Sequence, residues 1–309
     1  MNILITGGAG FIGHNTAIHL KNHGHHPIVY DNLKNSTTKA LTQLQKHKIP
    51  ITKADLLNPK TLKTALSNID TVIHAAAYIS VNESTKKPAK YVRNNVEGTT
   101  NIAKTCKDNN IKLIYISTAA VYGEPQTLPL NETHPTNPIS PYGITKLQGE
   151  QIINYYATQG LKHITLRLFN VYGPGQSNAY AGVITRFMQA ASLNKAPIIY
   201  GDGQQTRDFI HVEDVAEAIK LAVQSNNTNE TFNIASGKPT TINNIATLIL
   251  QHTNPNLKPK HAKQKPNDIR HSYADITKAQ KLLNFKPKIT LHEGIKNLIT
   301  KTSNIPTER

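Results

Sequence analysis

A tyrosine and a lysine four positions apart could perform acid–base chemistry. They are Tyr142 and Lys146, in the segment SPYGITKLQGE at residues 140–150. In a helix, positions i and i+4 lie on one face, so the ammonium group can approach the phenol. Nearby positive charge favours the phenolate of a tyrosine, whose ordinary pKa of about 10 makes it a poor base at neutral pH. The pattern alone is common, and an exposed helical pair is the simpler interpretation.

Three glycines near the amino terminus indicate a dinucleotide site. Gly7, Gly10 and Gly13 follow the apolar run NILIT and open a segment of helical periodicity. In such a motif the first glycine permits a tight turn, the second lets the backbone approach a pyrophosphate, and the third lets the helix pack on the strand. The unpaired N–H groups of the first helical turn then face the phosphates.

An acidic residue in the right place favours NAD over NADP. Asp31 ends the next apolar run, VYD, roughly 20 residues after the glycines, as the motif requires. A carboxylate there can accept both ribose hydroxyls of an adenosine and repels a 2′-phosphate. The alternative is that Asp31 only caps the turn before NLKNS.

Polar and small residues also follow other apolar runs, at the edge where open α/β sheets bind ligands. Asp55 follows the third run and is expected near an adenine amino group. Ala75 and Ala76 leave room for a dinucleotide beside the fourth run. Ser117 and Thr118 end the fifth run.

This context changes the interpretation of the opening pair. With a nicotinamide bound nearby, Tyr142 has two positive charges available, the ring of NAD⁺ and Lys146. Together they are expected to poise Tyr142 as the general base for a substrate hydroxyl, while the same carbon gives up hydride. The pair is therefore interpreted as catalytic.

Short β-branched runs alternate with helical periodicity over the first half of the chain, which predicts βαβ units and a mostly parallel sheet. The expected strands are residues 2–7, 27–31, 50–55, 70–75, 112–117 and 163–168. After residue 169 proline and glycine cluster, so a second, smaller lobe is expected. We assign residues 1–169 to an NAD-binding domain, to which the chain returns around 205–236, and residues 170–309 to a substrate-binding lobe.

Several motifs together resemble the extended short-chain dehydrogenase/reductase superfamily, and within it the NAD-dependent nucleotide-sugar epimerases similar to UDP-glucose 4-epimerase. They include TGGAGFIG, HAAA, STAAVYGE, SPYGITKLQGE, LRLFNVYGPGQ and YGDGQQTRDFIHVEDVAEA. The resemblance implies an α/β fold, with a Rossmann-type doubly wound parallel sheet and a smaller C-terminal substrate-binding lobe. It also implies NAD as cofactor and a UDP-sugar as partner. The implied activity is 4-epimerisation of a UDP-hexose, UDP-glucose or UDP-galactose, through a transient 4-keto intermediate.

The resemblance also implies roles for residues at matching positions. Tyr142 matches the catalytic tyrosine, Lys146 its partner lysine, and Thr118 the residue that hydrogen-bonds the reacting oxygen. Further positions that match NAD contacts are Phe11, Ile12, Asn32, Leu56, Asn94 and Phe169. Positions that match contacts to the diphosphate, the base or the sugar are Asn170, Val183, Tyr200, Arg207, Lys265, Asp268 and Ser272.

Two departures from the family pattern bear on the substrate. Relatives usually carry Arg-x-Gly-Asp where this chain has Lys265 to Asp268, so either Lys265 or Arg270 is expected to replace the phosphate-binding arginine. Ser272 stands where related epimerases carry a bulky tyrosine. This small residue is expected to leave room for an N-acetyl group, so UDP-GlcNAc and UDP-GalNAc are possible additional substrates.

A missing acid pair bears on the reaction. Related dehydratases carry two acidic residues directly after the Ser or Thr, which protonate the departing hydroxyl. Here Ala119 and Ala120 follow Thr118. This favours epimerisation over dehydration.

The bulk properties exclude several classes. The formal net charge of +16 invites a nucleic-acid or membrane interpretation, but the lysines are spread along the chain, so neither partner is expected. The single cysteine, Cys106, cannot form an internal disulfide, no apolar run is long enough to cross a membrane, and no signal peptide is visible, so a cytoplasmic protein is expected. None of the 14 histidines shows metal-ligand spacing, so no metal is expected.

Other classes remain open. A dehydratase, a reductase, or a UDP-glucuronate epimerase or decarboxylase on the same scaffold would share the cofactor site. A non-enzymatic NAD sensor or polyanion-binding protein would have no need for the three catalytic residues together. Kinship further suggests a homodimer that pairs helices near residues 84–108 and 141–159.

Overall fold

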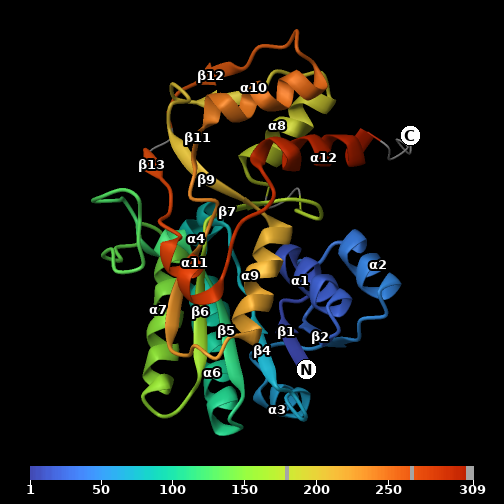
Figure 1. Ribbon diagram of the computed structural model, residues 1–309, viewed down its shortest axis with the longest axis vertical. Coiled ribbons are helices and arrows are strands. Elements are labelled where there is room, and N and C mark those ends of the chain that lie inside the picture. Colours follow the sequence, from blue (N-terminus) through green and yellow to red (C-terminus); the bar gives the residue numbers. More distant parts are fainter. Residues whose placement is uncertain (178–180, 265–267, 304–309) are drawn as a thin grey trace.

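A seven-stranded parallel sheet forms the larger part of the protein (Figure 1). The computed structural model describes residues 1–177, 181–264 and 268–303, with side chains as far as residue 300. Six strands coincide with the predicted runs: β1 (Asn2–Thr6), β2 (His26–Asp31), β3 (Ile51–Lys53), β4 (Thr71–His74), β5 (Lys112–Thr118) and β6 (His163–Leu168). The seventh, β10 (Glu230–Ile234), pairs with β6. The predicted doubly wound parallel sheet is thus confirmed.

The sheet has one point where the strand order reverses. Its order is β10-β6-β5-β4-β1-β2-β3, so the chain proceeds in one direction from β1 and in the other from β4. In register, Thr6 pairs with both Tyr30 and His74, and His74 pairs with Tyr115. The residues that follow these strands therefore emerge at one edge, beside the crevice where such sheets bind ligands.

Helices cover both faces of the sheet, which explains why its strands are continuous apolar runs. One face packs against α1 (Phe11–Asn22), α2 (Thr38–Lys46), α9 (Val212–Gln224) and α11 (Thr277–Leu283). The other packs against α3 (Pro59–Ala65), α6 (Gly98–Asp108) and α7 (Pro141–Ala157). Four short elements connect them: α4 (Val81–Lys86), α5 (Pro88–Tyr91), the π-helix η1 (Val92–Glu97) and the 3-10 turn η2 (Ala119–Val121).

A smaller lobe lies at the top of Figure 1 and has its own core. Its strands are β7 (Asn170–Tyr172), β8 (Ile198–Tyr200), β9 (Thr206–His211), β11 (Pro239–Thr241), β12 (Lys260–Ala262) and β13 (His271–Ser272). Its helices are α8 (Val183–Ser192), α10 (Ile242–Thr253) and α12 (Leu291–Ser303). Strand β9 lies at the centre of a four-stranded sheet with β7, β11 and β13, and β8 pairs with β12.

The chain passes between the two layers more than once. Strand β9 belongs to the small sheet, whereas α9 directly after it packs on α1, and β10 completes the large sheet. The return expected around 205–236 is therefore made by α9 and β10. Strand β9 does not take part in it.

Helix α7 is held unusually close to β5. The Ser140 hydroxyl accepts a hydrogen bond from the Gly143 N–H at 3.1 Å and caps the helix start. One turn before the middle of the helix, the Tyr115 hydroxyl of β5 donates to the Lys146 carbonyl at 3.2 Å. A Cβ atom on Gly149 would lie 2.2 Å from the Tyr115 oxygen, so only glycine fits there. This contact sets the distance between α7 and the sheet.

A substitution at this contact tests its importance. We expect Gly149→Ala to lower the free energy of unfolding by about 1–3 kcal/mol, because overpacking outweighs the better helix propensity of alanine. Gly98→Ala in the neighbouring helix is the matched control, since a Cβ there meets its nearest atoms, those of Leu56, at 3.4 Å. Urea unfolding of both variants measures the difference. Equal stability of the two variants would contradict the close docking of α7.

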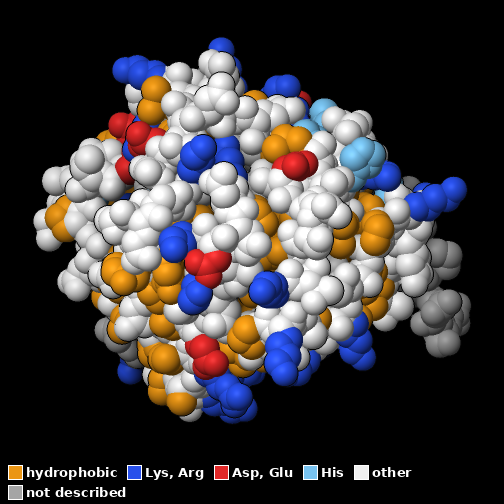
Figure 2. Space-filling view, turned by 90° about the horizontal axis from the view of Figure 1, so that it is seen from below, with side chains coloured by type: hydrophobic (Ala, Val, Ile, Leu, Met, Phe, Trp, Pro, Cys, Tyr) orange, Lys and Arg blue, Asp and Glu red, His pale blue; other side chains and the backbone are white. Residues whose placement is uncertain are grey.

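Positive charge is dispersed over the surface in the view from the lower end of the molecule. Figure 2 shows Lys and Arg side chains singly and in small groups, separated by acidic, apolar and neutral surface, with no continuous stripe on this face. This distribution agrees with the interpretation that the net charge of +16 comes from lysines spread along the whole chain. Among the described residues, no helix combines the length and apolar character needed to cross a membrane.

Candidate active site

Two adjoining cavities lie along the carboxyl edge of the large sheet. The smaller cavity, of about 110 Å³, lies over the ends of β1, β2 and β4. The larger cavity, of about 800 Å³, extends from the ends of β4, β5 and β6 to the small lobe. Ala75 and Ala77, just after β4, line both, so the two cavities meet there.

The glycine turn before α1 fits a dinucleotide. Gly7 has a φ of +67°, and a Cβ there would lie 2.6 Å from the backbone of Ala76. A Cβ on Gly13 would lie 2.3 Å from the Gly7 carbonyl oxygen, so this glycine lets α1 pack against the turn. Gly10 lines the smaller cavity and precedes α1 without any side-chain cap. The first N–H groups of the helix are therefore available for phosphate oxygens.

Asp31 both orders the turns around it and lines the smaller cavity. Its carboxylate accepts hydrogen bonds from the Leu33 N–H at 2.8 Å and from the Ala9 N–H at 3.0 Å, so it does order the turns around it. It also lines the smaller cavity at the end of β2. Burial raises the pKa of Asp31, and the two backbone hydrogen bonds act in the opposite direction. A carboxylate held in this way is suited to ribose hydroxyls.

The other predicted adenosine contacts gather around the same cavity. Asp55 accepts a hydrogen bond from the Asn32 amide at 3.1 Å, and both line the smaller cavity together with Leu56 and Ala76. Asn94 reaches it from the π-helix η1, an irregular helical form that often marks functional sites. Sequence reasoning missed four further lining residues in loops, where no periodicity signals them: Asn35, Ser36, Ala54 and Tyr78.

The proposed catalytic residues meet in the larger cavity. Thr118, Tyr142 and Lys146 all line it, together with Phe11, Ile12, Ser117 and Phe169. Thr118 is close enough to Tyr142 to lower the pKa of its phenol. The Lys146 ammonium nitrogen lies 4.1 Å from the centre of the Tyr115 ring, and only 3% of the residue is exposed.

Burial dominates the protonation of the pair. It raises the pKa of Tyr142 above its usual value, although the nearby Thr118 acts against this. It lowers the pKa of Lys146 to about 7, against the opposing influence of Glu150. In the protein alone these shifts favour neutral Tyr142, and the expectation that Lys146 and the NAD⁺ ring together poise it as a phenolate stays a prediction. Tyr142 is a phenol in the protein alone, and its activation needs a further positive charge.

A buried charge network supports Lys146 from below, and the sequence analysis missed it. Glu150, one turn after Lys146, accepts hydrogen bonds from the Ser117 hydroxyl at 2.5 Å and from Arg167 at 3.1 and 2.7 Å. Arg167 also lies over the ring of Tyr122, at 4.8 Å from its centre. Only the position of Glu150 four residues after Lys146 could have indicated this network, because Glu150 lies on helix α7 and Arg167 on strand β6.

The small lobe supplies the far wall of the larger cavity. Asn170, Val183, Tyr200, Arg207 and Asp268 line it, as the resemblance implied. Arg207 is bound to the Asp268 carboxylate at 2.6 Å and donates to the Thr206 carbonyl at 2.8 Å. Its remaining donors can face a diphosphate, which guanidinium groups bind in two-pronged fashion.

Two predicted substrate positions among the described residues, Arg270 and Ser272, do not line the cavity. Arg270 forms a bidentate ion pair with the exposed Asp202, with both distances 2.7 Å, and does not line the cavity. Ser272 is buried in β13, opposite Arg207 on β9, and is also absent from the lining. Lys265 lies outside the described residues.

Other lining residues were missed because they come from the small lobe, where the sequence pattern is loose. The polar and charged residues among them are Gln176, Arg186, Lys195 and Gln205. The Gln205 side-chain oxygen is buried and has no hydrogen-bond partner within the described parts of the chain. Arg186 and Lys195 are exposed and add positive charge to the mouth of the cavity.

The lowered pKa of Lys146 predicts a pH-dependent stability difference. The unfolded chain keeps the ordinary value of 10.5, and the folded chain has a value of about 7. Between these values the unfolded chain holds more protons, so the burial penalty is full below pH 7 and fades as the pH rises toward 10.5. We expect Lys146→Met to be more stable than wild type near pH 7, with a difference that shrinks toward pH 10.5.

Urea unfolding at several pH values measures this difference. Lys162→Met, at an exposed position, controls for the loss of one lysine. A stability difference for Lys146→Met that stays constant over the pH range would show that the lysine is not destabilised by burial.

Comparison with known proteins identifies the group to which this fold and site belong. The sequence profile of the NAD dependent epimerase/dehydratase family matches residues 3–235. The structure of a UDP-glucose 4-epimerase of Thermotoga maritima with UDP-glucose matches with a TM-score of 0.93 at 34% identity, over 98% of this chain and 99% of that chain. A UDP-N-acetylglucosamine 4-epimerase of Methanobrevibacter ruminantium, solved with UDP-N-acetylmuramic acid, has the same score, identity and coverage.

A relative with a different reaction is equally similar in sequence. A UDP-N-acetyl-alpha-D-glucosaminuronate decarboxylase of Bacillus cytotoxicus is 34% identical over 309 residues, covering 96% of each chain. These matches span nearly the whole chain and agree with the glycine turn and the cavities described above. The chain therefore belongs to the NAD-dependent epimerase/dehydratase family, as its sequence motifs predicted, and takes NAD as its cofactor.

Proposed function

We propose that the chain is a UDP-hexose 4-epimerase that interconverts UDP-glucose and UDP-galactose. The observation that carries the proposal is the presence of Thr118, Tyr142 and the buried Lys146 together in the lining of the larger cavity, which adjoins the smaller one at Ala75 and Ala77. The similarity to UDP-sugar epimerases of solved structure supports the substrate class.

In this proposal Tyr142 takes the proton of the C4 hydroxyl and later returns it. The bound NAD supplies the two-electron oxidation and reduction of C4. Thr118 hydrogen-bonds the reacting oxygen and can pass the proton to Tyr142. Lys146 holds the nicotinamide ribose from below, and its charge depends on Glu150. General acid–base catalysis of this kind contributes about 10²–10⁴-fold to a rate.

The surroundings of Thr118 favour epimerisation over elimination. Ala119 and Ala120 follow it, so no carboxylic acid stands where a departing hydroxyl would need a proton. Reduction of the 4-keto sugar from its opposite face gives the epimer. This requires the sugar to turn about its diphosphate while Arg207 and Asn170 hold the nucleotide, and the larger cavity of about 800 Å³ leaves room for the turn.

Wider specificity is a second part of the proposal. We infer that UDP-GlcNAc and UDP-GalNAc are also accepted, on the similarity to the Methanobrevibacter enzyme. Ser272 no longer supports this inference, because it is buried away from the lining. The alternative function is another NAD-dependent reaction of a nucleotide sugar, such as decarboxylation of a UDP-uronate, which the similarity to the Bacillus cytotoxicus decarboxylase favours.

Removing the phenol hydroxyl tests the catalytic assignment. We expect purified protein to convert UDP-glucose to UDP-galactose without added cofactor. Tyr142→Phe should lower turnover by about 10²–10⁴-fold and retain bound NAD, since the ring that packs in the cavity remains. Tyr155→Phe is the matched control, because Tyr155 lies on the same helix with 62% of its surface exposed.

Product analysis with UDP-glucose, UDP-GlcNAc and UDP-glucuronate separates the alternatives. Epimers of the neutral sugars support the proposal. Two results would overturn it if no substrate gives an epimer. One is the release of carbon dioxide from UDP-glucuronate, and the other is the formation of a dehydrated UDP-sugar.

A pair of arginine variants tests the diphosphate contact. We expect Arg207→Gln to weaken UDP binding by at least about tenfold, because a charge-assisted hydrogen bond contributes about 1.5–3 kcal/mol. Arg270→Gln should change UDP affinity less than about twofold, since Arg270 is engaged with Asp202 at the surface. Calorimetric titration with UDP measures both. A larger loss in Arg270→Gln than in Arg207→Gln would reverse the assignment.

We also propose a homodimer through α6 and α7 and their neighbouring turns. Val92 and Tyr155 support it, because 49% and 62% of their surfaces are exposed. Ile102 does not, because it is fully buried against the sheet.

We also propose, from the composition of the chain, that the protein is located in the cytoplasm.

A further inference from the structure

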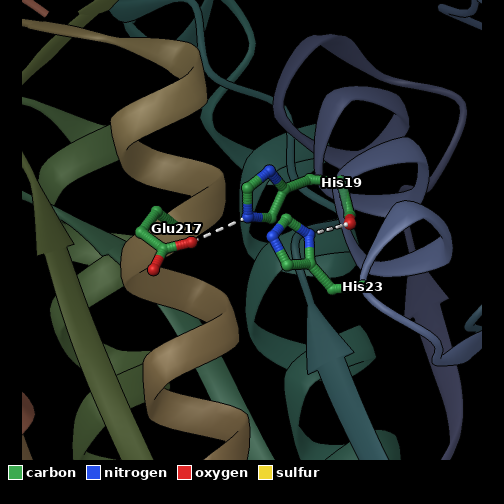
Figure 3. A group of neighbouring side chains, drawn as sticks. All are labelled: His19, His23 and Glu217. Carbon is green, nitrogen blue, oxygen red and sulfur yellow. Dashed lines mark hydrogen bonds and ion pairs between the residues drawn. The ribbon is translucent and has the colours of Figure 1, made fainter. Parts of the chain in front are cut away.

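Two histidines and a glutamate meet outside the cavities, where the sequence analysis expected no metal. His19 lies in the last turns of α1, and His23 directly follows the helix, so the two share one helical face at spacing i and i+4. Glu217, 198 residues after His19, faces them from α9. Figure 3 shows the two imidazole rings side by side, with the carboxylate opposite.

The donor atoms of the three side chains are already close. The His19 Nε2 atom lies 2.9 Å from the Glu217 Oε2 atom, and one donor atom from each residue lies within 4.8 Å of the others. In a tetrahedral zinc site, ligand atoms at 2.0–2.2 Å from the metal lie about 3.3 Å from one another. The present separations of the donor atoms are therefore close to those of a zinc site.

The outer hydrogen bonds also fit a metal site. The His23 Nδ1 atom is bonded to the His19 carbonyl oxygen at 2.8 Å. A carbonyl can only accept, so Nδ1 carries the proton and the Nε2 atom of neutral His23 has a free lone pair. Metal-binding histidines commonly donate their second ring N–H to a carbonyl in this way, which fixes the tautomer and the ring orientation.

We propose that His19, His23 and Glu217 bind one Zn²⁺ ion, which links the end of α1 to α9. Two imidazole nitrogens and one carboxylate oxygen suit zinc, with water as the fourth ligand, whereas Mg²⁺ and Ca²⁺ prefer oxygen ligands. The side chains of His19 and Glu217 are 22% and 24% exposed, and His23 is exposed, so an ion has access. The ion would replace the proton that His19 shares with Glu217.

One neighbouring group opposes the site. The Lys220 ammonium lies 2.8 Å from the same Glu217 oxygen, so it competes with the ion for the carboxylate. Zn²⁺ affinity should therefore rise in Lys220→Gln. This site is remote from the proposed chemistry and does not depend on the proposed function. A bound ion would tie the end of α1 to α9, and the glycine turn lies at the opposite end of α1.

Calorimetric titration with ZnCl₂ tests the site. His252 and His292 form a second exposed pair with their Nε2 atoms 3.4 Å apart, so the titration uses a His252→Gln parent without an affinity tag. We expect one Zn²⁺ per chain and at least about tenfold weaker binding in His23→Gln and in Glu217→Gln. His26→Gln, at the exposed histidine that begins β2, is the matched control and should bind as the parent does.

Thermal unfolding supplies a second readout. Because an ion that binds only the folded chain stabilises it, ZnCl₂ should raise the unfolding temperature of the parent and of His26→Gln, and not that of His23→Gln. MgCl₂ should raise none of them. The absence of a zinc complex in the parent, or equal weakening by His23→Gln and His26→Gln, would overturn the proposal.

Discussion

The close packing of α7 on β5 is the contact on which the site depends. Gly149 leaves no side chain between the helix and Tyr115, and the Tyr115 hydroxyl donates to the Lys146 carbonyl. As a result Lys146 is buried against the Tyr115 ring, where its charge is supported by Glu150 and opposed by loss of water.

The same burial makes Tyr142 a weak base as long as no cofactor is bound. Loss of water disfavours the charged form of both partners, so it raises the pKa of Tyr142 and lowers that of Lys146. A phenol beside a half-neutral lysine is a weak base. A bound cofactor with a positive ring changes the balance, because an added cation in a poorly hydrated site favours the phenolate. In the proposed mechanism, Tyr142 therefore acts as a base only when NAD⁺ is bound.

The sequence predicted those features that depend on local order along the chain. Strands buried on both faces are continuous apolar runs, so β1 to β6 were found within a few residues of their true ends. Because strand ends share one edge, Asp31 and Thr118 could be assigned to the crevice before the strand order was known. The protonation of Tyr142 was not predictable in this way, because counting nearby charges leaves out the cost of burial.

Features built from distant segments escaped the sequence analysis. Arg167 reaches Glu150 from another strand, and Glu217 meets His19 across 198 residues. No periodicity joins such positions, so only packing reveals them. Ser272 shows the opposite failure, since a family position suggested a pocket residue and the β13 strand buries the side chain elsewhere. In the small lobe, short strands and loops give no pattern from which lining residues such as Gln205 could be inferred.

We propose, as the central step, that the hydride of C4 passes to the bound NAD and returns to the same carbon without exchange with water, while the proton of the C4 hydroxyl passes to Tyr142 and back. UDP-glucose that carries deuterium on C4 tests it most directly, when it is converted in ordinary water by purified protein without added cofactor. The account predicts UDP-galactose that retains the deuterium at C4, as measured by mass spectrometry and NMR. Loss of the label to solvent, or a product oxidised at C4 that accumulates in place of the epimer, would contradict it.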